Sequence, residues 1–188
     1  GWDRILRWDG STWTQVTSPV ANASYYGLDA VGPNDIWAVD GRGVIVHYDG
    51  SQWSKVASPV TEWLTDVSMA SASDGWIVGN YGTLLHWNGA NWTKAAGDLT
   101  YTMLRGVSVL GDGAGVTGWA VGNNGTILRL AGGKWTTHCS LTGNDLWAVE
   151  AVSRYEAWAV GDNGVIVRWQ DPNPPRLPAR ARLPLVRR

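Results

Sequence analysis

The sequence lacks several features that would place it in a common class. It contains no phenylalanine, only one cysteine, Cys139, and only 16% charged residues. A lone cysteine cannot form a disulfide within the chain, so a disulfide-stapled scaffold is excluded and the redox compartment stays open. No apolar run approaches the ~20 residues that a membrane-spanning helix needs. The N-terminus shows no signal peptide, but the chain begins at Gly1 inside a repeat, so we expect that it has been processed or excerpted.

A strong charge of either sign is also missing. The formal net charge is −1 over 188 residues. Segment 171–188 holds five arginines and one aspartate, so the rest of the chain is mildly acidic. A mildly acidic body argues against nucleic acid as the main partner. The same segment holds five prolines and no strand pattern, so we expect an extended tail that is disordered or not native to the fold.

Tryptophan and glycine are abundant instead, with 14 and 24 copies. Two series of tryptophans each keep a spacing of 39 to 43 residues. The first series is Trp37, Trp76, Trp119 and Trp158, and the second is Trp13, Trp53, Trp92 and Trp135. A period of this size indicates a repeat architecture. We expect the rings to be wedged between sheets, with each buried indole N–H hydrogen-bonded.

Each repeat divides into four short apolar segments. The third repeat shows them as "LRGV" (104–107), "WAVG" (119–122), "TILRL" (126–130) and a segment that opens on Trp135. Their length, their β-branched and aromatic side chains and the flanking glycine and asparagine are typical of strands joined by hairpin turns. Four antiparallel strands per repeat without a helix predict an all-β β-propeller of four-stranded blades. A tandem β-solenoid is the competing fold, but its coils are shorter and need fewer turns.

The number of segments bears on how the propeller closes. The chain opens with a third and a fourth strand ("RILRW", 4–8, and "WTQVTSP", 13–19), continues through three full repeats and ends on a third strand. The total is seventeen strands. We expect four blades closed within the chain by the first fourth-position strand completing the last blade. The alternatives are five blades, or an arc completed by self-association of the exposed sheet edges.

The repeat resembles a known group of propellers. The unit L-x-x-V…W-A-V-G-x-x-G-x-I-L-R-W-D-G-x-x-W is similar to the BNR or Asp-box repeat, in particular that of Ycf48-type photosystem II stability and assembly factors. The similarity covers about residues 1–170. Asp9 and Asp49 match the box in kind, but lie four residues before the tryptophan rather than five, and Asn88 and Ala131 replace them in later repeats. The resemblance implies a propeller fold and a structural role for these aspartates.

Candidate binding residues are those that vary inside the constant frame. After the leucine of the first segment stand Asp29, Thr65, Arg105 and Trp147. By analogy with propellers this segment lines the central channel, so we expect the four side chains to face a common funnel. The alternative is a water-filled channel in which Asp29 pairs with Arg105.

Two further groups of residues extend this site. Aromatic residues in the loops before the first segment, Tyr26 and Trp63 with Tyr25 and Tyr101, offer flat faces to a sugar or a protein segment, or else fill gaps between blades. Near the channel, Asp66 and Glu150 offer carboxylate oxygens for a calcium ion. The spacing matches no EF-hand loop, so no cofactor is expected, with calcium as the one possibility considered.

The histidines do not form a catalytic group by their pattern. His47 and His86 occupy a position where other repeats have arginine, which favours a polar position near the blade exterior over a metal ligand or general base. His138 and Cys139 are adjacent, so a strand would point them to opposite faces. The chain also lacks the local motifs of hydrolases, metalloproteases, phosphate loops and dinucleotide sites.

Two functional hypotheses follow. The first is a non-catalytic binding or scaffold module that recognises a glycan or a protein segment at the channel mouth, with a possible homo-oligomer. The second is a propeller hydrolase, either a calcium-dependent lactonase or a sialidase-like glycosidase, using Asp29, Asp66, Arg105 and Glu150. The sequence leaves the location open and slightly favours the extracellular space or the cell envelope.

Overall fold

The computed structural model describes residues 4–95 and 97–171, and in this part of the chain it contains seventeen strands and no α-helix. The strands form five antiparallel sheets. The first sheet is β1 (Arg4–Trp8) with β2 (Trp13–Thr17), and the second is β3 (Tyr25–Gly32), β4 (Asp35–Asp40), β5 (Ile45–Tyr48) and β6 (Trp53–Val56). The third is β7 (Leu64–Ser71), β8 (Asp74–Gly79), β9 (Leu84–Trp87) and β10 (Trp92–Lys94). The fourth is β11 (Leu104–Asp112), β12 (Gly115–Gly122), β13 (Ile127–Ala131) and β14 (Lys134–His138), and the fifth is β15 (Leu146–Ser153), β16 (Glu156–Gly161) and β17 (Ile166–Gln170).

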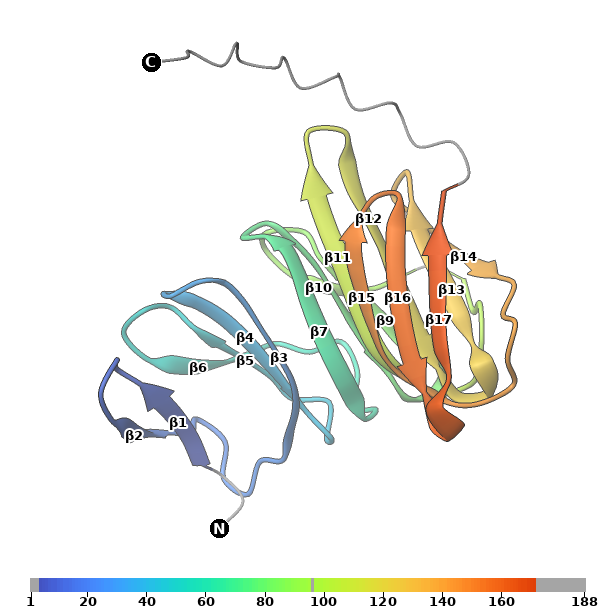
Figure 1. Ribbon diagram of the computed structural model, residues 1–188. Coiled ribbons are helices and arrows are strands. Elements are labelled where there is room, and N and C mark those ends of the chain that lie inside the picture. The colour runs from blue at the N-terminus through green and yellow to red at the C-terminus, as the bar shows by residue number, and fades with distance from the viewer. Residues whose placement is uncertain (1–3, 96, 172–188) are drawn as a thin grey trace, which may run out of the picture.

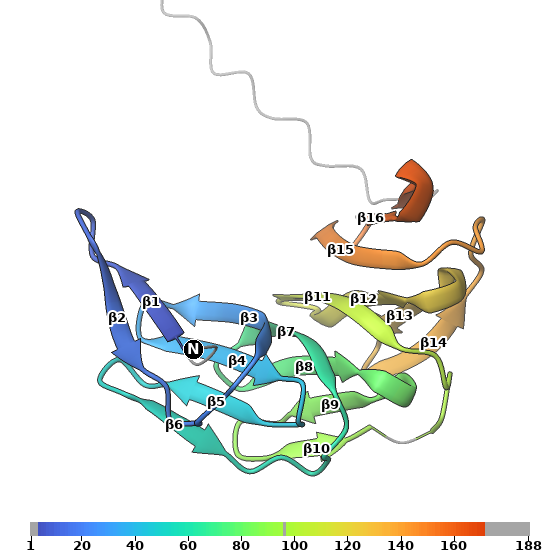
Figure 2. The same ribbon diagram turned by 90° about the horizontal axis from the view of Figure 1, so that it is seen from below.

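The sheets follow one another in a curved row, as the blades of a β-propeller do (Figure 1). Within each sheet the strands pair in chain order, so every sheet is a simple meander. Seen from below, β3, β7, β11 and β15 lie on the inner side of the arc, and β6, β10 and β14 lie on the outer side (Figure 2). The predicted all-β fold, the strand count and the four-stranded blades are therefore confirmed, and the solenoid is excluded.

Closure within the chain is not formed in the described residues. The β1–β2 hairpin is a separate two-stranded sheet, and β17 pairs only with β16. The two lie at opposite ends of the arc (Figure 2). The expectation of a ring closed by β2 is thus not met, because the hairpin pairs with itself in the register Trp8 to Trp13 instead. The predicted tail lies, apart from Asp171, outside the described residues.

Tryptophans fill the joints between blades, as expected. Trp37 of β4 meets Trp92 of β10 with ring centroids 5.5 Å apart, and Trp76 of β8 meets Trp135 of β14 at 5.4 Å, both nearly edge to face. Both pairs lie in apolar clusters that join neighbouring sheets. Such aromatic pairs add to the free energy gained from the buried area alone. The hydrogen-bond prediction is wrong for three of the rings: within the described residues, the buried indole N–H groups of Trp76, Trp92 and Trp135 have no acceptor.

A polar clamp holds the tryptophan of the second strand in two blades. His47 stacks on Trp37 and its Nε2 lies 2.8 Å from Asp35 Oδ1. In the next blade, His86 stacks on Trp76 and contacts Asp74 in the same way. The histidines are therefore partly exposed polar groups with a structural role. Arginine replaces them because its guanidinium can also lie over the ring and bind the acid, as Arg168 does with Glu156.

The glycine that ends the second strand is required by a close approach of two backbones. Gly122 has an extended backbone, but a Cβ atom there would lie 2.1 Å from the carbonyl oxygen of Met103. That carbonyl accepts the N–H of Asn123 at 2.9 Å, which ties the turn after β12 to the start of β11. Asn124 and Gly125 then turn the chain with positive φ, which asparagine and glycine tolerate. The same close approach recurs at Gly79 and Gly161.

Candidate binding cleft

An open cleft of about 460 Å³ lies where the inner strands begin. It is lined by Tyr26, Trp63, Thr65, Met103, Arg105 and Trp147. Five of these are among the six residues predicted from the sequence to bind a ligand. The cleft draws on β3, β7, β11 and β15 and on the loops before them, so four neighbouring blades contribute to it. Its volume lies within the ~300–1,000 Å³ of typical ligand sites.

One side of the cleft is a stacked pair of Arg105 and Trp147. The guanidinium carbon of Arg105 lies 3.8 Å from the centroid of the Trp147 ring. Arg105 Nε donates to Asn123 Oδ1, and its terminal nitrogen lies 3.5 Å from a carboxylate oxygen of Asp145. The indole N–H of Trp147 donates to Asp162 Oδ1 at 2.6 Å. Both side chains are therefore held in place, and the half-exposed indole presents a fixed apolar surface.

Another part of the lining is the aromatic pair of Tyr26 and Trp63. Their ring centroids lie 4.9 Å apart at 58°, and both rings are exposed. Gly41 lies beneath them, where a Cβ atom would be 3.0 Å from Tyr26 and 3.4 Å from the Trp63 indole nitrogen. A larger residue in this turn would lift the rings. The pair thus rests on backbone, and little side-chain freedom remains to be lost on binding.

The remaining lining residues are Thr65, which was predicted from the sequence, and Met103, which was not. Thr65 Oγ1 donates to the carbonyl of Leu104 at 2.7 Å and lies 3.1 Å from that of Val78, so its hydroxyl fastens β7 to the next blade. Met103 is the residue not foreseen. It directly precedes the leucine of its repeat, as Trp63 does, and this shared position is the signal that could have identified it.

Asp29 does not line the cleft. Its carboxylate accepts the N–H of Ala30 at 2.8 Å and the N–H of Met69 at 2.6 Å. It therefore fastens β3 to β7 across a blade joint. The alternative pairing with Arg105 is not formed either, because Arg105 pairs with Asp145. The expectation that Asp29 joins the other three residues in one funnel is thus corrected.

Asp66 plays a similar fastening role in a more buried place. Its two carboxylate oxygens accept the N–H groups of Val67 and Val107, both at 2.9 Å. Burial raises the pKa of the Asp66 carboxyl to about 6, the two N–H donors oppose that rise, and the negative charges of Asp29 and Glu150 add to it. Among residues 4–95 and 97–171, no group of three histidine, cysteine or acidic side chains could hold a metal ion.

Similarity to known proteins is found in structure but not in sequence. No protein-family model matches the chain, and no curated protein matches it. A virginiamycin B lyase from Staphylococcus aureus superposes with a TM-score of 0.69 at 15% identity, over 90% of this chain and 63% of the lyase. YCF48 bound to a D1 peptide gives 0.65 at 18% identity, over 91% and 57%. The WD40 β-propeller domain of Doa1 gives 0.71 at 12% identity, over 89% and 57%.

These similarities show the β-propeller fold alone. Identities this low carry no information on activity. The chain spans less than two thirds of each of the three structures. They include a peptide-bound protein and a lyase, which are properties of those proteins. The described part of the chain contains no helix of the length and apolarity needed to cross a membrane.

Proposed function

We propose that this propeller is a non-catalytic binding module whose cleft holds a segment of another protein. The observation that carries the proposal is the arrangement of three exposed aromatic rings, Tyr26, Trp63 and Trp147, around one cleft. Aromatic side chains with two χ angles supply large contact area at low entropic cost, and they dominate protein-binding hot spots. The YCF48 structure, which holds a D1 peptide, supports this choice of ligand class.

The chemistry of the cleft favours an extended peptide with apolar side chains over a glycan. Met103 offers an apolar, adaptable surface and the fixed Trp147 ring offers an apolar face. Arg105, which is paired with Asp145, is the one cationic group among the lining residues. A glycan site would need several planar or charged hydrogen-bonding groups directed into the cleft. The Thr65 hydroxyl and the Trp147 indole N–H are already committed to protein acceptors.

Selection from a displayed random-peptide library, run beside a glycan array, tests this proposal. We expect peptides with aromatic or branched residues, and we expect Trp63→Ala to weaken their binding about tenfold or more. Tyr101→Ala is the matched control, because Tyr101 is an exposed aromatic of the equivalent loop but does not line the cleft. Glycan binding alone, or equal losses in the two variants, would contradict the proposal.

A second candidate, a propeller hydrolase that uses calcium, rests on one observation. Asp66 is a buried acid with a pKa of about 6, close enough to Asp29 and Glu150 to feel their charges, and perturbed groups gather at active sites. Against it, Asp29 and Asp66 are each held by two backbone N–H groups. Turnover of an ester, lactone or glycoside that needs calcium and is lost in Asp66→Asn would establish the enzyme.

We infer that the arc belongs to a closed ring. The cleft already uses residues from four adjacent blades, and closing the ring would bury the sheets at its two ends. Of the routes considered from the sequence, closure within the chain needs β2 to reach β17 across the open side of the arc (Figure 2). Completion by a second copy is the route that the end surfaces support.

A further inference from the structure

The two ends of the arc expose the repeat positions that the inner joints bury. Trp158 of β16 is 40% exposed, whereas its equivalents Trp37, Trp76 and Trp119 are at most 6% exposed. Ile166 of β17 is 68% exposed, and the equivalent Ile45, Leu84 and Ile127 are buried. At the other end, Leu28 and Val31 of β3 are exposed, although Leu64, Val67, Leu104 and Val107 at the same positions are buried. Each end of the arc thus presents one of the two apolar faces that pack together in an inner joint.

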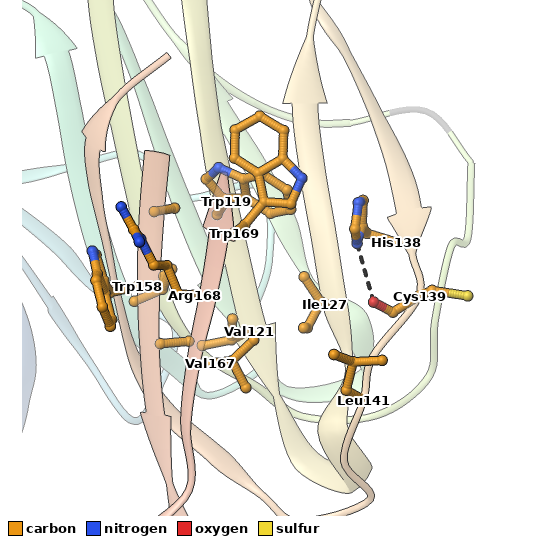
Figure 3. A pocket seen from close by; sticks show the side chains of 13 residues that line it. Trp119, Val121, Ile127, His138, Cys139, Leu141, Trp158, Val167, Arg168 and Trp169 are labelled. Carbon is orange, nitrogen blue, oxygen red and sulfur yellow. Dashed lines mark hydrogen bonds between the residues drawn. The ribbon is translucent and has the colours of Figure 1, made fainter. Parts of the chain in front are cut away.

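An apolar pocket of about 240 Å³ marks the incomplete outer edge of the last joint (Figure 3). It lies between Trp119 and Ile127 of the fourth sheet and Val167 and Trp169 of the fifth. In the inner joints the corresponding tryptophan receives the edge of a ring from the fourth strand of the next blade. Within the described residues the fifth sheet has no fourth strand. Trp119 contacts Trp169 of that sheet at 4.7 Å, and in its own sheet it contacts His138 at 5.1 Å and the Arg129 guanidinium at 5.5 Å.

Trp13 occupies the fourth-strand position of Trp92 and Trp135, but it is not buried between two sheets. It opens β2, just as Trp92 opens β10 and Trp135 is the first core residue of β14. Those two rings are about 5% exposed, whereas Trp13 is 66% exposed. The pocket is smaller than the ~300 Å³ lower limit of small-molecule sites, so a single side chain suits it better than a ligand.

We propose that β2 of a second copy pairs with the free edge of β17 and inserts Trp13 against Trp119. An unpaired sheet edge next to an apolar pocket is the usual site of strand addition. The completed blade would contain β15, β16 and β17 of one copy and β2 of the other.

The repeat fixes the register of this pairing. In the complete sheets Trp87 pairs with Trp92 and Tyr48 with Trp53, so Trp169 would face Trp13 and Arg168 would face Thr14. In the first sheet β1 holds that place, with Trp8 opposite Trp13 and Arg7 opposite Thr14. In the exchanged pair β17 therefore takes the place of β1. Both strands contain an Arg-Trp pair. The exchange gives β2 an equivalent partner that is already embedded in a blade.

The same step buries the remaining exposed positions. With β2 in the fifth sheet of the other copy, that sheet becomes the neighbour of the second sheet of β2's own chain. Trp158, Val160 and Ile166 then face Leu28 and Val31, the contact that every inner joint makes. The interface joins a head to a tail, so two copies that exchange β2 reciprocally close a ring. Each copy contributes three full sheets and one shared blade.

Light scattering of the full chain over a concentration series tests the association. We expect a mass of two chains, and we expect Trp13→Ala to raise the dissociation constant about thirtyfold or more, as for a tryptophan hot spot. Trp8→Ala is the matched control, because it removes an exposed ring from the neighbouring strand that the exchange displaces. It should leave the association intact or strengthen it. Trp13 is exposed, so its loss should not prevent folding, and circular dichroism checks this.

Disulfide trapping distinguishes a second copy from closure within one chain. Opposed residues of an antiparallel pair lie close enough for a disulfide, so Thr14→Cys and Arg168→Cys should cross-link two chains when the single variants are mixed in a Cys139→Ser background. A disulfide between Arg7→Cys and Thr14→Cys should hold β2 on β1 and keep the chain monomeric until it is reduced.

Three results would overturn the proposal: a monomeric wild type at all concentrations, association unaffected by Trp13→Ala, or no cross-link between chains when the two single variants are mixed. These readouts are independent of the cleft. Failure to select a peptide would leave the masses and cross-links unchanged, whereas failure of the association would leave peptide binding to be judged by itself.

Discussion

The same residue types are buried in the joint between the second and third sheets and exposed on the uncovered face of the fifth sheet. Trp37 and Val39 are buried between two sheets, whereas the equivalent Trp158 and Val160 are 40% and 45% exposed. The sequence around them is nearly identical. What buries a residue of this repeat is therefore the neighbouring sheet and not its own. A blade alone offers two apolar faces, and stability arises from stacking, as in other repeat proteins.

The comparison also separates structural from functional positions. The constant tryptophan, valine and leucine make equivalent contacts in the joints between the second, third and fourth sheets. The residues that vary, Thr65, Arg105 and Trp147, meet in the cleft instead. Variation within a constant frame thus indicates where a ligand can be recognised, and constancy indicates what holds the frame.

Removing one tryptophan from each environment tests most directly whether the neighbouring sheet sets its contribution to stability. Trp76→Ala should lower the free energy of unfolding by about 3–5 kcal/mol, because it leaves a cavity in a joint. Trp158→Ala should lower it by less than about 1 kcal/mol, because the ring is partly solvated already. Urea unfolding in a Trp13→Ala background, where association is suppressed, gives both values. Equal losses would show that burial by the neighbouring sheet does not set the stability.

A buried and an exposed aspartate should make the stability depend on pH in opposite directions. Burial raises the pKa of Asp66 to about 6, so the folded state holds a proton that the unfolded state releases near pH 4. Stability therefore falls as the pH rises from about 4 to about 6, by on the order of 2–3 kcal/mol. Asp49 lies in an exposed turn, where N–H and hydroxyl donors lower its pKa to about 2. Its contribution is present above pH 4 and is lost as the pH falls towards 2.

Unfolding free energies measured from pH 2 to 7 separate the two aspartates. Asp66→Asn should abolish the fall between pH 4 and 6 and leave the acid limb below pH 4. Asp49→Asn should retain the fall and reduce the acid limb, because its amide cannot lose a negative charge. An unchanged fall between pH 4 and 6 in Asp66→Asn would assign that titration to another group.

Most of the fold could be predicted from the sequence, because each strand carries its own pattern and the period repeats it. Thr65, Arg105 and Trp147 could also be placed in one cleft, since a fixed position in each repeat occupies the same end of each inner strand. Tyr26 and Trp63 could be added because they are aromatic residues just before that position. Asp29 could not, because its main partner is the backbone N–H of Met69, and a backbone partner has no sequence signature. Closure could not be predicted either, because it depends on the angle between blades, which the repeat does not specify.

The smallest expected effect concerns the glycines at the end of the second strand. Gly122 and Gly161 approach a carbonyl oxygen equally closely, since an added Cβ atom would lie 2.1 Å from that oxygen at Gly122 and 2.2 Å at Gly161. Replacement by alanine must push two backbones apart, which costs about 1–3 kcal/mol in a packed setting. Around Gly122 the fourth sheet is held on both faces, whereas the fifth sheet around Gly161 has one free face and can move outward. We therefore expect Gly122→Ala to lie at the upper end of that range and Gly161→Ala at the lower end when urea unfolding is measured on the monomeric background. A reversed order would show that the free end of the arc is the more rigid one.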